Sequence, residues 1–313
     1  MTTVSFSATG THTTFVVPTG ITSLDIDIVG GNGGPPWAVG TPPVAAGRGT
    51  RLQATITVIP GETLTLQVGE AGRYSANAGV NGDRIGGTGS DPLVTGLGGY
   101  PDGGAGGKSG ITGSFYAGGG GGSTRIWRGG IGGTLLAIVA AGGGIGFIDG
   151  TVEGGSPTVT GNGGQPSPGQ NGRNVDISGT TLLNPGIGAT SSAGGAAGLG
   201  ASPGASLAGG DGAPYVLSPF QYSGGGGGGG LFGGGGGGRE LLSARRMGSQ
   251  GGGGSSYVIP GATSVVWSIN ANAATGGTSE DLYIVQAGGS ITLTYVEETT
   301  PVGWSLGLVK MLG

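Results

Sequence analysis

The amino-acid sequence predicts an all-β fold, an antiparallel β-sandwich of jelly-roll type that both ends of the chain build together. Short segments of alternating apolar and polar residues near both ends are typical of half-buried strands. Helix patterns are nearly absent, being limited to residues 239–247 and 304–312. Glycine supplies 84 of the 313 residues and is concentrated between the two β-rich ends. This distribution predicts an inserted region of a different kind.

The first 68 residues contain five predicted strands. The segment Leu24–Ile28 alternates apolar with acidic residues, and the even-numbered positions from Leu52 to Val58 are all apolar. Such alternation places one face of a strand against a core and the other in water. We expect the five strands to form one face of the sandwich; they are residues 3–7, 13–17, 24–28, 51–59 and 63–68.

The carboxyl end supplies three more predicted strands, at residues 265–269, 282–285 and 291–295. The last two are joined through Gly288 and Gly289, a turn signal between strands. The sequence therefore divides into three parts. Residues 1–68 and 258–298 are expected to form the sandwich, residues 69–257 the glycine-rich insertion, and residues 299–313 a separate tail.

The glycine-rich insertion is expected to be ordered, although glycine loses more backbone entropy on folding than any other residue. Polyproline-II-type helices repeat every three residues and leave their N–H and C=O groups free for neighbouring chains. Glycine recurs at this period at 104, 107, 110 and 113. We therefore predict a polyglycine-II helix bundle. Collagen is a poor alternative, because no long Gly-X-Y repeat exists and prolines number only 17.

Composition disfavours several functional classes. Charged residues make up 9% of the chain and the net charge is -4, which provides no basic surface for nucleic acid. The longest apolar run, residues 135–141, is too short to span a bilayer, so we expect no membrane insertion. There is no cysteine for a disulfide framework. No signal-peptide pattern follows Met1, so ordinary secretion is not expected.

Enzyme motifs are weak, and we predict no catalytic residue, cofactor or metal site. The single histidine, His12, lies beside an early strand without a clear partner. Residues 102–109, DGGAGGKS, come close to a phosphate-binding loop, but Asp102 replaces its first glycine and no helix follows. Asp25 and Asp27 share one strand face, where they are solvated residues or a weak cation contact.

A series of motifs, most of them glycine-rich, follows along the chain at residues 15–31, 58–69, 118–126, 135–144, 224–230, 233–238 and 251–258. Taken in this order, they resemble the glycine-rich tail proteins of tailed bacteriophages, over residues 1–296. The same series is also similar to the glycine-rich extracellular module of anaplastic lymphoma kinase receptors. Each motif is of low complexity, so the resemblance rests on their order along the chain.

This resemblance implies a rigid protein at the tip of a phage tail, located in the virion, that binds a host cell-surface receptor during adsorption. The receptor is expected to be a glycan, a glycolipid or a protein. Other tail proteins are implied as partners, as is a homo-oligomer such as a trimer. The alternative is a purely structural minor tail protein that bridges subunits. A bacterial cell-envelope adhesin would need an export signal that the sequence lacks.

Bulky residues that interrupt the glycine framework are the candidates for receptor binding: Trp127, Tyr215, Phe220 and Tyr222. The segment 215–222 is preferred, because prolines at 214 and 219 accompany three aromatic residues without a glycine. Aromatic rings there can stack on sugars or enter a protein pocket. The competing interpretation is that such rings pack against the sandwich or cap the bundle.

The tail after residue 298 is too apolar to remain comfortably in water. Trp304, Leu306, Leu308 and Met311 are its candidate assembly residues. They either fold back on the sandwich or bind another subunit, and we favour the second because Pro301 and two acidic residues separate the tail from the domain.

Overall fold

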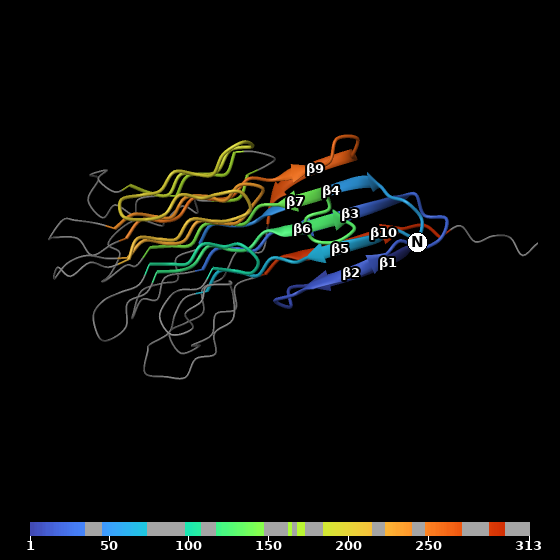
Figure 1. Cartoon of the computed structure of the whole chain (residues 1–313), viewed down its shortest axis with the longest axis horizontal. Helices are drawn as coiled ribbons and strands as arrows, with labels where there is room; N and C mark the ends of the chain where they lie inside the picture. The colour runs from blue at the N-terminus through green and yellow to red at the C-terminus, as the bar shows by residue number, and fades with distance from the viewer. Residues whose placement is uncertain are drawn as a thin grey trace, which may run out of the picture.

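The computed structural model is all-β, with ten strands and no helix within the residues it describes. These residues are 1–34, 46–73, 98–107, 117–146, 162–164, 168–172, 184–214, 223–239, 248–270 and 288–297. The strands form two five-stranded antiparallel sheets. Figure 1 shows an elongated molecule, with the strands at one end and extended glycine-rich segments at the other.

The first sheet joins the two ends of the chain. Its strands lie in the order β1-β10-β3-β4-β9, and each pair is antiparallel. Because β10 lies between β1 and β3, the carboxyl end completes a sheet that the amino end begins. The bounds are β1 (Thr2–Ser7), β3 (Ser23–Val29), β4 (Thr50–Thr57), β9 (Thr263–Ile269) and β10 (Ser290–Tyr295).

The second sheet has the order β2-β5-β6-β7-β8. Its strands are β2 (His12–Val16), β5 (Thr63–Gln67), β6 (Thr124–Arg128), β7 (Thr134–Val139) and β8 (Tyr257–Val258). The expectation that the first five strands form a single face is therefore wrong: β1, β3 and β4 belong to the first sheet, β2 and β5 to the second. The alternation shows that each strand has an apolar face, but either sheet can bury that face against the shared core.

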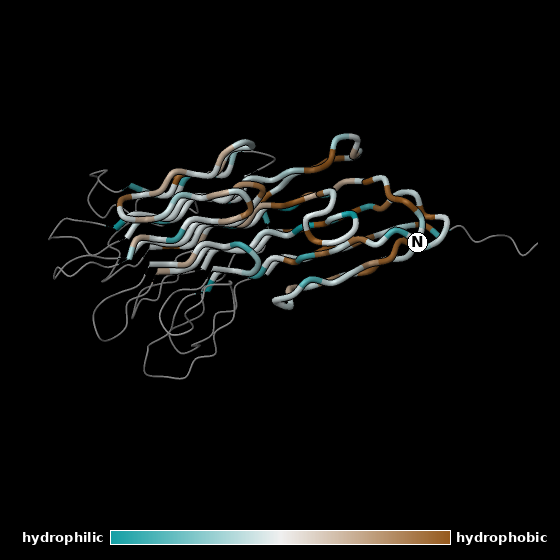
Figure 2. The backbone as a smooth tube through the Cα atoms, in the orientation of Figure 1, coloured by the Kyte–Doolittle hydropathy of each residue, from teal (hydrophilic) through white to brown (hydrophobic). Residues whose placement is uncertain are grey.

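One hydrophobic core is shared by the two sheets. Leu24, Ile28 and Leu52 of the first sheet are 0% exposed, as are Leu66 and Ile126 of the second. Figure 2 shows the most hydrophobic residues mainly along the strands, while the glycine-rich segments are largely pale. Burial of these side chains is the main stabilising contribution in this half of the molecule, at about 25 cal/mol per Å² of apolar surface.

Two strands of the second sheet lie in the range expected to be purely insertion. β6 and β7 fall within residues 69–257, yet β6 pairs with β5 along residues 125–128. The apolar run 135–139 is the signal for β7, which ends at Val139. The predicted strand 282–285 lies outside the described residues. The same holds for the predicted helix segments 304–312 and 239–247, apart from Arg239.

The glycine-rich segments are extended, belong to no strand ladder, and are joined by backbone hydrogen bonds. Segment 224–229 is the clearest case, because consecutive N–H groups point to different neighbours. Gly224 and Gly227 donate to segment 210–213, Gly225 and Gly228 to segment 249–252, and Gly226 and Gly229 to segment 118–121. The partner therefore changes at each residue and returns after three.

The carbonyl groups of the same segment follow the same rule. Those of residues 224 and 227 accept from segment 104–107, those of 225 and 228 from segment 234–237, and those of 226 and 229 from segment 141–144. Segment 224–229 is thus bonded to six neighbouring segments, at N···O distances of 2.8–3.0 Å. Side chains do not fit there: a Cβ on Gly227 would lie 2.0 Å from the Gly234 carbonyl oxygen.

Candidate functional site

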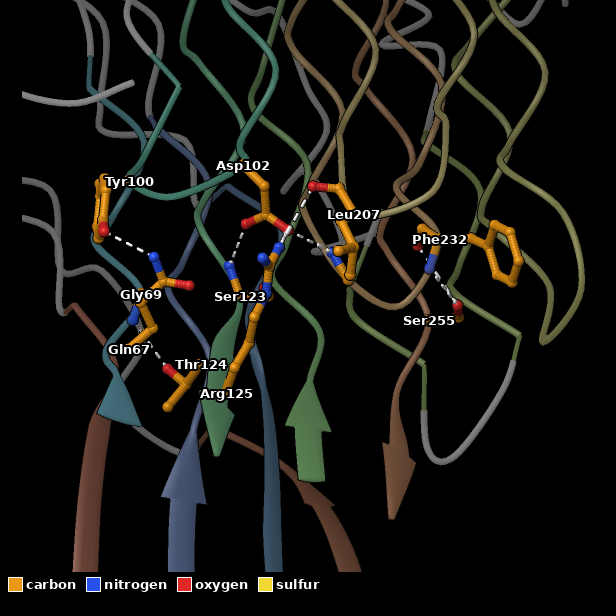
Figure 3. A network of polar contacts seen from close by, with 11 residues as sticks. Gln67, Gly69, Tyr100, Asp102, Ser123, Thr124, Arg125, Leu207, Phe232 and Ser255 are labelled. Atoms are coloured by element: carbon orange, nitrogen blue, oxygen red, sulfur yellow. Dashed lines mark hydrogen bonds and ion pairs between the residues drawn. The ribbon is translucent and has the colours of Figure 1, made fainter. Parts of the chain in front are cut away.

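Polar residues gather where the strands of the second sheet pass into the glycine-rich segments (Figure 3). We call Asp102, Ser123 and Arg125 the junction network. Asp102 Oδ1 accepts from the Ser123 N–H at 2.8 Å, and its Oδ2 accepts from the Ser123 hydroxyl at 2.9 Å. The Gly230 N–H also donates to Oδ2, at 3.2 Å. One carboxylate thus connects three segments that are far apart in the sequence.

Arg125 neutralises this carboxylate. Its guanidinium forms an ion pair with Asp102, and the two side chains are only 6% and 4% exposed. Arg125 Nε donates to the Ser123 hydroxyl at 2.8 Å, and Nη2 donates to the Leu207 carbonyl at 3.3 Å. A buried pair of charges is tolerated when its remaining donors and acceptors are satisfied in this way. The guanidinium also lies 5.7 Å from the centre of the Trp127 ring.

Two further contacts fix the same junction. The Thr124 hydroxyl donates to the Val29 carbonyl at 2.5 Å and accepts from the Gly69 N–H at 3.0 Å. It therefore links β3 of the first sheet to the segment that follows β5. The Gln67 amide donates to the Tyr100 hydroxyl at 2.6 Å. Strand ends and glycine-rich segments are consequently held by side chains at the junction and by backbone groups beyond it.

The junction network positions segments and leaves few groups free for other ligands. The Ser123 hydroxyl both donates to Asp102 and accepts from Arg125. In the loop that resembles a phosphate-binding motif, the N–H groups of Gly103, Gly104 and Gly107 donate to backbone carbonyls. The Ala105 N–H donates to Asp211 at 2.8 Å. Engaged donors of this kind are not available to cradle a phosphate.

Trp127 does not have the exposure that its predicted role in receptor binding requires. The structure places it in β6 with 3% of its surface exposed. Its ring is covered within the fold and contacts Arg125. This burial corresponds to the competing interpretation, in which the aromatic residue serves packing, because a ring that is out of solvent cannot stack on a receptor.

The other receptor-binding candidates, Tyr215, Phe220 and Tyr222, lie outside the described residues, as do Trp304, Leu306, Leu308 and Met311. The described residues on either side of segment 215–222 can be placed. Ala141, two positions after β7, donates to Gly229, whereas Ala213 accepts from Gly224 at the other end of the same segment. Ala213 and Gly224, described residues that flank segment 215–222, therefore lie on the side of the glycine-rich region away from the sheets.

Within the described part of the chain, no group of three or more acidic, histidine or cysteine residues could hold a metal ion. Nor does any described helix have the length and hydropathy needed to cross a membrane. On β3, Asp25 is exposed and Asp27 is half-buried, and both have protein partners: Thr55 donates to Asp25 at 2.6 Å, and Gln53 donates to Asp27 at 3.1 Å.

The importance of Asp102 and Arg125 was not predicted from the sequence. The sequence does contain a signal for this pair. Only 9% of the residues are charged, so an acidic and a basic residue within or beside glycine-rich segments have few other charged partners. Their pairing depends on tertiary contacts between residues 23 positions apart.

No protein-family model matches this chain, and no curated protein sequence matches it. The interpretation of the site therefore rests on the geometry described above.

Proposed function

We propose that this chain is a bacteriophage tail-tip or tail-fibre protein that binds a host cell-surface receptor during adsorption. The observation that carries the proposal is the hydrogen bonding of segment 224–229 to six neighbours. A region joined in this way is a rigid support, and the described residues that flank segment 215–222, Ala213 and Gly224, lie on its side away from the sheets. Binding residues are commonly found on connecting segments held by a rigid scaffold.

The proposed architecture is a jelly-roll-like β-sandwich that carries a polyglycine-II bundle. In such a helix the N–H direction turns by about 120° per residue, so partners recur every three residues. The partners of segment 224–229 recur with this period. Gly195 and Gly198 support the same arrangement, because both donate to segment 233–236. The shared core between two antiparallel sheets supports the sandwich.

In the proposed function, Tyr215, Phe220 and Tyr222 contact the receptor, a glycan, glycolipid or protein. Residues 299–313 attach the chain to other tail proteins or to further copies in a homo-oligomer such as a trimer. The protein is then located in the virion, at the tail tip. No catalytic residue or cofactor is part of this proposal.

The second candidate function is a purely structural minor tail protein that bridges subunits without touching a receptor. The burial of Trp127 favours it, because one of the four predicted recognition residues serves packing instead. In that case residues 215–222 would contact another virion protein.

Adsorption of assembled particles distinguishes the two functions. Replacing Tyr215, Phe220 and Tyr222 by alanine is expected to lower the adsorption rate at least about tenfold, since each lost aromatic contact costs about 1 kcal/mol or more. Particle yield is expected to remain normal. Thr292→Ala, on the solvent-facing side of β10, is the matched control. Reduced particle yield with normal adsorption per particle would support the structural function.

The tail is tested separately. Deleting residues 301–313 is expected to abolish incorporation into particles while the isolated chain keeps its thermal unfolding transition. Normal incorporation of the truncated chain would contradict the assembly role of Trp304, Leu306, Leu308 and Met311.

A further inference from the structure

Three Asn-Gly pairs make the same two hydrogen bonds to a neighbouring segment of the glycine-rich half. The asparagine Oδ1 accepts a backbone N–H, and the N–H of the following glycine donates to a carbonyl of the same segment. The asparagine bonds are Asn32 with Gly49 at 2.9 Å, Asn162 with Arg48 at 2.7 Å and Asn171 with Gly188 at 3.0 Å. The glycine bonds, at 2.8–2.9 Å, are Gly33 with Gly47, Gly163 with Arg48 and Gly172 with Gly186. We call each pair of bonds an Asn-Gly clamp.

In a clamp the asparagine oxygen takes the place of a backbone carbonyl. The residues on both sides of Gly188 donate to carbonyls of other segments, whereas Gly188 donates to Asn171. The same holds for Arg48 and Gly49, which lie between two residues that donate to backbone carbonyls. The clamps therefore satisfy N–H groups that the neighbouring backbone does not reach.

Asn-Gly is also the dipeptide most prone to spontaneous deamidation, because glycine has no side chain to hinder ring closure. The glycine backbone nitrogen attacks the asparagine Cγ and gives up its proton. The bond from Cγ to the side-chain nitrogen breaks, ammonia leaves, and a cyclic succinimide remains. Water then opens this ring at either carbonyl. One product is aspartate; the other is isoaspartate, in which the backbone runs through Cβ and Cγ.

A closed clamp opposes this reaction at both reacting atoms. The attacking N–H is bonded to a carbonyl, and the side-chain carbonyl is held by another segment, so Cγ cannot turn toward the nitrogen. The backbone has little room to rotate, since a Cβ on Gly172 would lie 2.2 Å from the Gln250 carbonyl oxygen. Asn32 and Asn162 are 1% and 8% exposed, but Asn171 is exposed. Protection at Asn171 therefore depends on its clamp and not on burial of its side chain.

We propose that Asn32, Asn162 and Asn171 are conditional modification sites, unreactive while their clamps are closed and converted to isoaspartate once the clamps open. Isoaspartate adds one carbon to the backbone. The N–H groups that follow then no longer point to partner segments with a period of three residues. A clamp that has reacted cannot close again, so prolonged opening leads to irreversible loss of order in the glycine-rich half.

Peptide mass spectrometry of the full chain tests the proposal. Folded chain and urea-unfolded chain are kept at the same mildly alkaline pH and temperature, and isoaspartate at the three positions is measured over time. Each position is expected to react at least about tenfold more slowly in the folded chain, because only the open fraction reacts. Equal rates at Asn171 in the two states would overturn the proposal, since that side chain is exposed in the folded chain.

Refolding tests the effect of the longer backbone. Wild-type chain aged in urea and then returned to buffer is expected to lose its unfolding transition in proportion to its isoaspartate content at the three positions. Asn171→Asp is the matched control, because its carboxylate can still accept from Gly188 and its backbone has the normal length. This variant is expected to refold when it is not aged. Full refolding of chains that carry isoaspartate at these positions would contradict the proposal.

Discussion

The two halves of this molecule have interiors of opposite kinds. Between the sheets the space is filled by side chains, such as those of Leu24, Leu52 and Leu66, which are 0% exposed. In the glycine-rich half it is filled by backbone, and segment 224–229 touches six other segments through N–H···O bonds. The first interior depends on the volume of its side chains, and the second depends on their absence. A one-carbon change should therefore have different consequences in the two halves.

The glycine-rich half shows how a region with few apolar side chains can still be ordered. Hydrogen bonds contribute modestly when they replace bonds to water, at about 1 kcal/mol each. Buried backbone groups that lose their partners are far more costly. The glycine-rich half satisfies these groups by close approach of neighbouring segments, and glycine allows that approach. Its order is consequently cooperative, since removing one segment leaves several others without partners.

The largest effect is expected from Gly227→Ala. The new Cβ would lie 2.0 Å from the Gly234 carbonyl oxygen, and backbone cannot give way as a flexible side chain does. We expect a loss of about 4 kcal/mol or more in the free energy of unfolding, with hydrogen-exchange protection lost across residues 224–229. Gly130→Ala is the matched control, because no atom lies within 4 Å of its Cβ position. Wild-type stability of Gly227→Ala would contradict a backbone-filled interior.

Breaking the junction between the halves should have the next largest effect. Asp102→Ala leaves the guanidinium of Arg125 buried at 6% exposure without its counter-charge. A loss of about 3–5 kcal/mol is expected by chemical denaturation. The double variant Asp102→Ala with Arg125→Met should recover part of that loss, because no unpaired charge remains. If both variants unfold at the same denaturant concentration, the charge is not the cause.

In the side-chain interior, Leu66→Ala is expected to cost about 2–4 kcal/mol, from lost apolar burial and the cavity left behind. The comparison predicts that this loss, caused by removing three carbons, is smaller than that caused by adding one carbon at Gly227. Denaturant titration of both variants under the same conditions measures the difference. A larger loss for Leu66→Ala would reverse the ranking of the two interiors.

The smallest effect is expected on the outer surface of the first sheet. Arg51 pairs with Asp27 at 2.5 Å, with 40% and 30% of their side chains exposed. The hydrogen bond to Asp27 raises the pKa of Arg51, so the guanidinium is charged at every pH of interest. Arg51→Ala is expected to cost less than about 1 kcal/mol, and less again in 1 M salt. A larger, salt-independent loss would show that the pair has a structural role.

Much of the sheet half could be predicted from the sequence, because alternation depends on local residues alone. Seven predicted strands are confirmed as β1, β2, β3, β4, β5, β9 and β10, within one or two residues at most ends. Their division between two sheets could not be predicted, since the apolar face of β5 is the same whichever sheet it joins. The sequence does not predict β6, because Arg125, Ile126, Trp127 and Arg128 do not alternate between polar and apolar as the residues of an amphipathic strand do.

The site was less predictable than the fold. The three-residue spacing of Gly104 and Gly107 correctly indicates which N–H groups share a partner segment, since both donate to segment 224–227. The identity of that partner depends on tertiary packing, and so does the pairing of Asp102 with Arg125. The spacing of the glycines therefore predicts which residues of a segment share a partner segment, but it does not predict which segment that partner is.

The position of β10 has a consequence for the order of events during synthesis. β1 is translated well before β10, yet within the described sheet it pairs only with β10, and Thr3 and Thr294 are 291 positions apart. The first sheet therefore cannot close until β10 has been translated. Contacts of such long sequence separation form slowly. During synthesis the edges of β1 and β3 that β10 will cover remain open, so chaperone binding to the nascent chain would be most useful there.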